Sequence, residues 1–400
     1  MSDLSYLKYD EVFKPGLFPE YTYVSRKSPD VNFTYELRLK QALKTAGFLT
    51  SIIGPSKTGK TVLCEKVIGI DSMVSITGSD LKNRENFWNI VAAKVGLSVE
   101  GEYSNESTLT EQTVSGYKHT QSSTAKEKYV VTKDLVIDYF KSHELVLVLD
   151  DFHYASEELQ LEIAHQLKDA IRKEFKVVII SLPHRADDAI RKNPDLTGRL
   201  NLINIEPWKM EELKSIAIIG FKKLQVPVNE QVIERMAAES LTSPQLMQSI
   251  CLNLCLLSEV DETHHLNEDL LEQSYKFTTI NLPYKEVIQK IQAGPSTRGQ
   301  KRKKYQSITH EELDVYGIIL AAIALDPPSI SITIDNLKDR VDELIISSEK
   351  GPDKSKLKDT LDNIQTIMTE SASIYQVFEW KDNKIYILEP LFLFYLRWGI

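Results

Sequence analysis

The hydrophobic positions of residues 34–207 form short apolar runs that alternate with amphipathic segments. Short strand-like runs occur at residues 48–53, 73–77, 144–151, 176–182 and 201–205. Those at 144–151 and 176–182 contain the longest continuous apolar stretches, which are typical of buried parallel strands. Segments with apolar residues at helical spacing lie before and between them, at residues 35–45, 60–68, 87–95, 132–141 and 157–173. This alternation predicts an α/β fold, a parallel sheet with helices on both faces.

Residues 98–130 interrupt the alternation. They are rich in Ser, Thr and Glu and include few large apolar side chains. A segment of this composition buries little apolar surface, and such long connections are uncommon in compact domains. We therefore expect an exposed loop insertion here, partly disordered, whose role the sequence does not reveal.

Beyond residue 207 the pattern changes to helices alone. Apolar residues recur at helical spacing over residues 211–224, 230–239 and 245–258. Pro244 follows Ser243 at the start of the last of these segments, where a serine cap and a first-turn proline favour a helix. We expect a small helical bundle here, which would act as a lid on the preceding α/β domain.

The C-terminal hundred residues show a third pattern. Helical periodicity at residues 310–325, 334–346 and 354–369 precedes two short strands, 376–380 and 384–388, which Asp382-Asn383 would join as a turn. Helices followed by a hairpin are the order of a winged helix. The predicted divisions are an N-terminal extension at 1–33, an α/β core at 34–207 with its insertion at 98–130, a helical lid at 208–292, a basic linker at 293–307 and a winged-helix-like domain at 308–400.

One loop between a predicted strand and a predicted helix has the pattern G-x-x-x-x-G-K-[ST]. In that context the pattern is a phosphate-binding loop, whose glycines allow successive N–H groups to converge on a β-phosphate at a helix N-terminus. Lys60 is expected to reach the β- and γ-phosphates, and the Thr61 hydroxyl to hold Mg²⁺. The alternative is a Gly/Lys-rich turn with no ligand. The predicted nucleotide-binding residues of this loop are Gly54, Pro55, Ser56, Lys57, Thr58, Gly59, Lys60, Thr61 and the adjoining Val62.

A second candidate element ends the apolar run at residues 144–151. Its two last residues, Asp150 and Asp151, would lie at the carboxyl end of a central strand. In a P-loop site Asp150 would bind Mg²⁺ through water, while Asp151 would orient or deprotonate the attacking water. The two acids also suit a second role, as caps of the helix expected near Ser156, and the two roles are compatible.

Four further candidate site residues lie next to the last two predicted strands. Ser181, His184 and Arg185 lie at the carboxyl end of one strand, where ligand groups collect in open α/β sheets. His184 is equally well explained as a polar turn residue. Arg199 precedes the last strand and is a candidate arginine finger toward a neighbouring subunit's nucleotide, or else a member of a surface ion pair.

Composition and charge narrow the class of protein. A chain of 400 residues exceeds what one core usually serves, and its net charge of −9 argues against nonspecific coating of nucleic acid. No apolar run approaches the length that spans a bilayer, so no membrane partner and a cytoplasmic location are expected. Three cysteines offer no disulfide framework. Cys251 and Cys255 are better explained as buried thiols than as metal ligands.

Five basic residues gather at residues 298–304, in a Gly/Pro/Ser-containing stretch. They suit either a solvated linker or an arm that contacts DNA phosphates. The two interpretations remain open at the level of sequence.

Several segments together resemble the STAND class of AAA+-related ATPases, in the branch of archaeal-type and bacterial ATPases with a winged-helix tail. The resemblance extends over most of residues 20–400 and rests on Gly54 to Thr61, Asp150-Asp151-Phe152-His153, Ser181-Leu182-Pro183, Glu206-Pro207-Trp208, Ser243-Pro244-Gln245-Leu246-Met247 and the terminal Glu389 to Trp398. It implies an ATP-dependent switch that is closed at rest and forms homo-oligomers when a signal opens it. Several relatives in this class act in bacterial defence against phage.

The resemblance also assigns residues. It implies that Pro244 touches the adenine base and that Arg185 is a sensor. No nuclease, TIR-like or protease signature occurs in the chain, so a separate effector polypeptide is expected. The leading hypothesis is thus a slow, Mg²⁺-dependent ATPase switch. Its rivals are a DNA-handling AAA+ protein of the origin-binding or transposition-regulator kind, which grips DNA through its winged helix, and a scaffold that holds ATP without hydrolysing it.

Overall fold

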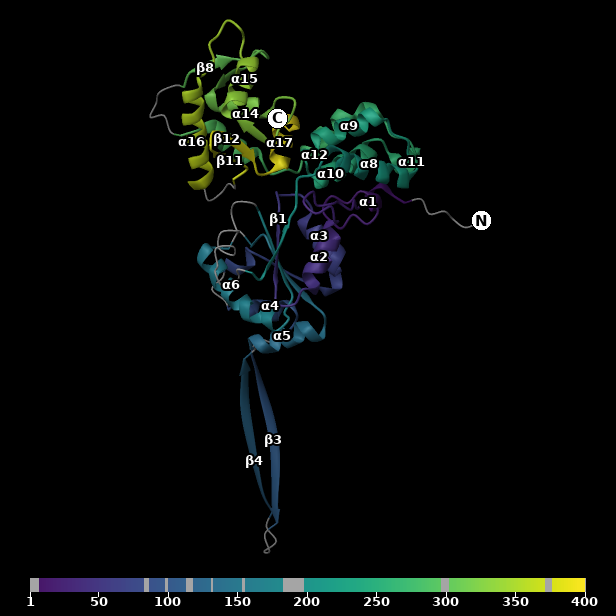
Figure 1. The fold of residues 1–400 in the computed structure, drawn as a ribbon, viewed down its shortest axis with the longest axis vertical. Helices are drawn as coiled ribbons and strands as arrows, with labels where there is room; N and C mark the ends of the chain where they lie inside the picture. The colour runs from purple at the N-terminus through teal and green to yellow at the C-terminus, as the bar shows by residue number, and fades with distance from the viewer. Residues whose placement is uncertain are drawn as a thin grey trace, which may run out of the picture. The chain divides into compact units, whose positions relative to one another are not determined.

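The chain forms two compact units, which are described separately. The computed structural model describes residues 7–82, 86–97, 100–112, 118–130, 132–152, 155–182, 198–295, 302–370 and 376–399. The α/β unit comprises Lys27–Gly54 and Lys60–Ile205. The helical unit comprises Met1–Arg26, Pro55–Gly59 and Glu206–Ile400, so it includes the tip of the predicted phosphate-binding loop (Figure 1).

A parallel five-stranded sheet forms the centre of the α/β unit. Its strand order is β2-β5-β6-β1-β7, and every neighbouring pair is parallel. The strands are β1 (Leu49–Ile53), β2 (Met73–Thr77), β5 (Val146–Asp150), β6 (Val177–Ser181) and β7 (Leu200–Asn204). The predicted α/β fold with a parallel sheet is confirmed.

Alternating side chains of the strands build two hydrophobic layers. On one face, Leu147 and Leu149 of β5 pack with α4 (Phe87–Lys94), α5 (Lys133–Ser142) and α6 (Glu157–Arg172). On the other face, Val146 and Val148 pack with residues of α2 (Tyr35–Lys44) and α3 (Lys60–Ile68). Both faces of the sheet are covered, which explains why the central strands β5 and β6 are apolar except at their last residues.

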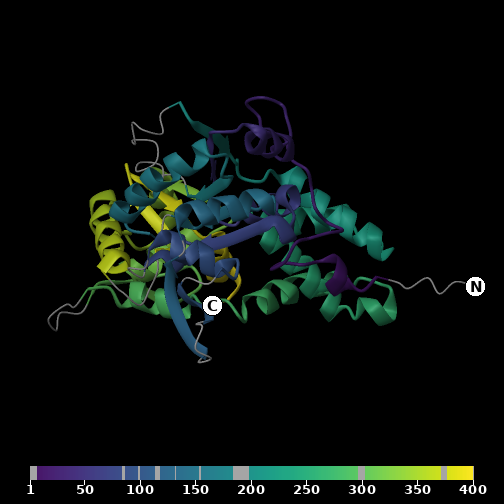
Figure 2. The same ribbon diagram turned by 90° about the horizontal axis from the view of Figure 1, so that it is seen from below.

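The insertion at residues 98–130 is a long hairpin rather than the expected irregular loop. Its strands β3 (Glu100–Gln112) and β4 (Lys118–Val130) are 13 residues each and pair antiparallel along their full length. The hairpin projects away from the helices of the α/β unit, and the view from below foreshortens it (Figures 1 and 2). The two strands pair only with each other, as edge strands of a two-stranded sheet, and their sequences lack the alternating apolar pattern that identifies half-buried strands.

Helices form the first part of the helical unit. They are α8 (Met210–Leu224), α9 (Glu230–Glu239), α10 (Pro244–Leu257), α11 (Val260–Thr263), α12 (Leu271–Thr279) and α13 (Lys285–Ala293). The N-terminal segment with α1 (Tyr9–Val12) packs on them: the Phe13 and Phe221 rings meet edge-on with centroids 5.2 Å apart. Residues 7–26 are therefore part of this unit's core.

The C-terminal part of the helical unit combines helices with a small sheet, and its winged-helix character stays a prediction. Three helices, α14 (Val315–Ala324), α15 (Ile334–Leu344) and α16 (Lys354–Glu370), accompany a three-stranded antiparallel sheet in the order β10-β12-β11. Its strands are β10 (Ser331–Thr333), β11 (Phe378–Lys381) and β12 (Lys384–Ile387), and a last helix, α17 (Pro390–Trp398), follows.

The start of this C-terminal part differs from the prediction. The helix expected from residue 310 begins at Val315, because the Asp314 side chain accepts hydrogen bonds from the Tyr316 and Gly317 N–H groups and caps it there. The preceding residues form β9 (Glu312–Asp314), which pairs with β8 (Lys304–Gln306). The end of the predicted linker is therefore a strand.

An ion pair with little solvent exposure joins α17 to α9. The Arg397 guanidinium donates to both carboxylate oxygens of Glu239, at 3.0 and 2.7 Å, and the Trp398 indole donates to the same carboxylate. The side chains of Arg397 and Glu239 are 9% and 11% exposed. Within the described ranges, no helix is both long and apolar enough to cross a bilayer.

Candidate nucleotide-binding site

The predicted phosphate-binding loop runs from the end of β1 to the start of α3. Two of its residues, Lys57 and Gly59, have left-handed backbone conformations, with φ of 61° and 87°. The Thr58 hydroxyl donates to the Pro55 carbonyl over 2.9 Å and closes the loop on itself. A glycine at position 59 meets the conformation without the strain that a Cβ would add.

Lys60 is the first residue of α3 and its side chain is buried within the loop, with 8% of the residue exposed. Its ammonium donates to the Gly54 carbonyl over 2.9 Å. The N-terminal N–H groups of a helix and a buried ammonium both favour an anion. The loop therefore concentrates positive potential where the sequence predicts the phosphates.

Thr61 and Asp150 meet, as the sequence predicts for two residues that share a metal. The Thr61 hydroxyl donates to Asp150 Oδ2 over 2.6 Å, although 89 residues separate them in the chain. A hydroxyl and a carboxylate are the oxygen ligands that suit Mg²⁺. In the described part of the chain no three His, Cys, Asp or Glu side chains gather as a metal site. A magnesium ion would thus take its other ligands from phosphates and water, which is its usual behaviour beside nucleotides.

Asp151 follows directly, in a left-handed backbone conformation. Its φ is 49°, in the left-handed region, and its N–H donates to Asp150 Oδ1 over 2.8 Å. The residue is exposed. An ideal Cβ built on Gly78 would lie 2.3 Å from the Asp151 carbonyl oxygen, so only glycine fits beside this turn. Gly78 is a supporting residue that sequence reasoning missed.

Asp150 also affects the ionisation of α3. Burial, and then the charge of Asp150, raises the pKa of the Glu65 carboxyl and of the Cys64 thiol. Negative charges that lie close together repel one another, and a bound cation would reduce this repulsion.

Strand β6 lies between β1, which leads into the phosphate-binding loop, and β5, which ends in Asp150. Ser181, its last residue, is buried, and its carbonyl accepts a hydrogen bond from the Gly54 N–H at 3.4 Å. The order β5-β6-β1 puts the carboxyl ends of three strands side by side, where α/β sheets bind ligands. His153, His184 and the predicted sensor Arg185 lie outside the described residues.

Arg199 lies at the amino ends of the strands, whereas the phosphate-binding loop follows the carboxyl end of β1. It immediately precedes β7, and its carbonyl accepts from the Leu49 N–H at the start of β1. Its guanidinium is 3.9 Å from the Cβ position that Gly47 would have. Because β1 and β7 are parallel, Arg199 and the loop after β1 are at opposite ends of the strands. Its action on a neighbouring subunit stays a prediction.

Pro244 is the first residue of α10 in the helical unit. The Ser243 hydroxyl accepts from the Leu246 N–H at 3.2 Å and caps the helix as expected. The predicted contact between Pro244 and adenine stays a prediction.

The tip of the loop is bound by two residues whose contact with it sequence reasoning missed. The Trp208 indole donates to the Thr58 carbonyl over 2.9 Å. The Ser56 hydroxyl donates to Glu389 Oε1 over 2.9 Å. These partners are 150 and 333 residues from the loop in the chain, and no local pattern could have linked them.

Arg26 holds Trp208 in place. Its guanidinium lies 4.6 Å from the indole ring centroid, a cation–π contact. It also donates to the carbonyls of Glu206 and Pro207 and to the Glu212 carboxylate, at 2.8, 2.9 and 3.0 Å. The N-terminal segment therefore supports the residue that touches the loop.

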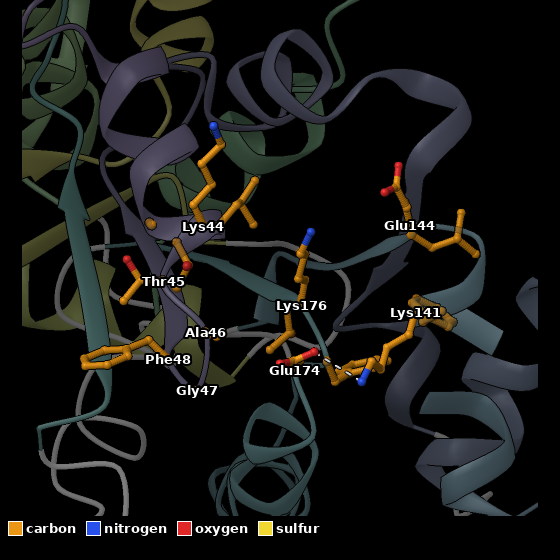
Figure 3. A pocket seen from close by; sticks show the side chains of 16 residues that line it. Lys44, Thr45, Ala46, Gly47, Phe48, Lys141, Glu144, Glu174 and Lys176 are labelled. Carbon is orange, nitrogen blue, oxygen red and sulfur yellow. Dashed lines mark ion pairs between the residues drawn. The ribbon is translucent and has the colours of Figure 1, made fainter. Parts of the chain in front are cut away.

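A separate hollow of about 390 Å³ lies at the amino ends of the strands, away from the phosphate-binding loop. Its rim includes Lys44, Lys176 and Glu144, together with an ion pair between Lys141 and Glu174 at 3.2 Å (Figure 3). The end of the sheet that holds this hollow has none of the predicted nucleotide-binding residues. The binding of a nucleotide at the loop stays a prediction.

The described members of the basic stretch make contacts with neighbouring residues. Arg302 pairs with Asp314 at 3.1 Å and lies over the Tyr316 ring, while Lys304 pairs with Glu312 at 3.2 Å. These contacts fit a structural role at the start of the C-terminal part. Arg298 and Lys301 lie outside the described residues.

Comparisons with known proteins show similarity at the level of the fold. No protein-family model and no curated protein matches the chain. Similar solved structures include a Cdc6p from Pyrobaculum aerophilum (TM-score 0.45, 15% identity, 96% of this chain and 94% of that chain covered). A Walker-type ATPase from Pyrococcus abyssi has a TM-score of 0.48 and 14% identity over 90% of this chain and 94% of its own. An Aeropyrum pernix ORC2 protein has a TM-score of 0.47 and 13% identity over 94% of each chain.

Proposed function

We propose that this protein binds and slowly hydrolyses ATP with Mg²⁺ and works as a nucleotide-controlled switch. The contact between Thr61 and Asp150 beside the buried Lys60 is the observation that supports this proposal most directly. It joins a phosphate-binding loop and an acidic strand end, the two parts that nucleoside-triphosphate hydrolysis needs.

Each residue of the site has a distinct part in the reaction. The loop N–H groups and Lys60 bind and orient the phosphates and offset the charge that develops on them. Thr61 and Asp150 hold Mg²⁺, which when bound neutralises phosphate charge. The exposed Asp151 carboxylate orients the attacking water and accepts its proton.

Two substitutions separate binding from turnover. We expect Lys60→Ala to abolish ATP binding, because the loop loses its only described buried ammonium. We expect Asp151→Asn to bind ATP normally and to lose at least about a hundredfold in turnover, because a neutral amide cannot accept the proton. Phosphate release, measured beside equilibrium binding, checks both.

Equal turnover for Asp151→Asn and the wild type would contradict the role of Asp151. No phosphate release from the wild type, with ATP bound and with every plausible partner present, would favour the non-hydrolysing scaffold instead.

The switch, the oligomer and the cellular role are further parts of the proposal. We propose that ATP controls homo-oligomerisation, and that the chain is the regulatory ATPase of a bacterial defence system that acts on a separate effector polypeptide. The support is the resemblance to STAND ATPases and the absence of an effector signature in the sequence. A gene for an effector next to this one would support the defence role. A replication or transposition gene in its place would count against it.

DNA handling is the second candidate, and the winged-helix element order is the observation that favours it. Charge is against it: residues 302–400 contain twelve Lys or Arg and sixteen Asp or Glu. If the protein grips duplex DNA, binding will weaken steeply with salt and will be lost when Lys301 to Lys304 are neutralised. We expect no such binding.

A further inference from the structure

The β3–β4 hairpin of the α/β unit has two open edges. Its strands pair with each other over 13 residues, and in the described part of the chain no third strand joins either of them. Each strand therefore keeps an outward row of backbone N–H and C=O groups along its length. A hairpin of only two strands is marginally stable in water, and pairing with a further strand would stabilise it.

The charged residues of the hairpin are sorted between its two strands. Strand β3 contains four glutamates and no basic residue, whereas β4 contains three lysines and one glutamate. Alternate residues of a strand lie on opposite faces, and the register puts even-numbered residues of β3 opposite even-numbered residues of β4. One face therefore has an acidic column beside a basic column. The residues of the two columns are Glu100, Glu102 and Glu106 on β3, and Lys118, Lys126 and Lys128 on β4.

The register within the hairpin shows how the two columns fit together. Glu102 is directly opposite Lys128, and Lys126 is diagonal to both Glu102 and Glu106. Opposite charges in these positions stabilise a sheet, whereas like charges directly opposite each other destabilise it. A second hairpin that placed its own β3 beside β4 would repeat this arrangement. Each lysine of the column would then have acids on the strands at both of its sides.

We propose that this hairpin joins copies of the chain head to tail, with β4 of one copy pairing antiparallel to β3 of the next. The inference supplies an interface for the proposed homo-oligomer and rests on that part of the proposed function. A symmetric pair through two β3 edges or two β4 edges would bring columns of like charge together. The head-to-tail junction brings unlike columns together. Because it uses two different surfaces, it repeats from copy to copy and forms a ring or a filament.

Sedimentation velocity of the full-length protein tests this junction, with and without a nonhydrolysable ATP analogue and Mg²⁺. Two variants each reverse one column: Glu102→Lys/Glu106→Lys and Lys126→Glu/Lys128→Glu. We expect each variant alone to associate about tenfold more weakly than the wild type, because every junction then brings like charges together. Association of the wild type should also weaken as sodium chloride is raised. Association that is unchanged in both variants would overturn the inference.

A mixture of the two variants distinguishes a contact between copies from a contact within one hairpin. Each junction in the mixture can join a basic column to an acidic column, although both kinds of hairpin keep like charges internally. We therefore expect the mixture to associate to within about threefold of the wild type. A mixture that associates as weakly as its components would show that the substitutions act inside the hairpin, and would contradict the junction.

Lys40→Glu/Arg172→Glu is the matched control. It makes the same change of net charge as the lysine variant, at exposed positions of α2 and α6 in the same unit. It should associate as the wild type does. A loss as large as that of the hairpin variants would assign the effect to total charge and would overturn the inference.

Disulfide capture identifies which edges meet. Thr108→Cys on β3 and Ser122→Cys on β4 are made in separate chains, and these positions are opposite each other in the register. The native cysteines are buried. An equimolar mixture of the two chains should form mainly the mixed disulfide under mild oxidation. A majority of disulfides between identical chains would contradict the head-to-tail order.

The failure of the inference and the failure of the proposed oligomer have different results. A wild type that stays monomeric with and without nucleotide removes the proposed oligomerisation, and the inference with it. A wild type that associates, in variants with either column reversed as well as in its native form, removes the inference alone.

Discussion

Burial determines the chemistry of the chain's cysteines. Cys64, Cys251 and Cys255 are all buried and unpaired with one another, as the sequence predicts for a chain without a disulfide framework. Burial raises the pKa of each thiol, and nearby negative charge raises it further. A thiol with a raised pKa holds little thiolate at neutral pH and reacts slowly.

We therefore expect the native protein to resist thiol reagents at pH 8. Ellman's reagent should detect fewer than one thiol per chain in buffer and three after denaturation. Because the pKa values are raised, reactivity should stay low throughout the pH range where an exposed thiol ionises. Rapid reaction of two native thiols would contradict the packing of α10, which contains Cys251 and Cys255.

At the residue scale, some residues of the candidate site are expected from the sequence, and others appear only in the structure. Gly54 to Thr61 are contiguous, and Asp150 ends a recognisable strand, so the sequence alone leads to the prediction that they form one site. Trp208 and Glu389 reach the loop only through tertiary packing, across 150 and 333 residues of chain. A single sequence contains no signal for such contacts, because each partner alone is an ordinary Trp or Glu.

At the scale of elements, the ion pair that fixes α17 to α9 is the strongest polar contact to test. Removing one partner of a buried pair leaves the other charge uncompensated. Arg397→Ala leaves Glu239 without its guanidinium and should lower the free energy of unfolding by about 3 kcal/mol. Urea unfolding measures the change.

The matched control is Arg235→Ala, which breaks an exposed pair with Glu272, where the side chains are 55% and 64% exposed. It should change stability by less than about 1 kcal/mol. Similar effects of the two substitutions would mean that the α17 contact contributes no more than a surface pair.

Elements were predictable where apolar residues repeat. Helix α3, strand β2 and helix α9 begin and end where the pattern places them. The β3–β4 hairpin has no apolar repeat although each of its strands has 13 residues, and β8, with three residues, is too short to show a period. The prediction missed these strands because the sequence has no periodic apolar pattern there, and not because its pattern favours another structure.

At the scale of the whole molecule, the division into two units crosses the phosphate-binding loop. Residues Pro55–Gly59 cluster with the helical unit, while Lys60 and Thr61 belong to the α/β unit.

We expect the molecular mass in solution to rise when a nonhydrolysable ATP analogue and Mg²⁺ are added. The same addition to Lys60→Ala should leave the mass unchanged, because the loop cannot hold the phosphates. Light scattering coupled to size-exclusion chromatography measures both. A wild-type mass that does not depend on nucleotide would count against the switch.

The most direct measurement is a crystal structure of the protein with a nonhydrolysable ATP analogue and Mg²⁺. We predict triphosphate density against the N–H groups of residues 54–61, with the metal next to the Thr61 hydroxyl and near Asp150. An empty loop at saturating nucleotide, or a nucleotide bound in the hollow between Lys44 and Lys176, would contradict the assignment on which the proposed function depends.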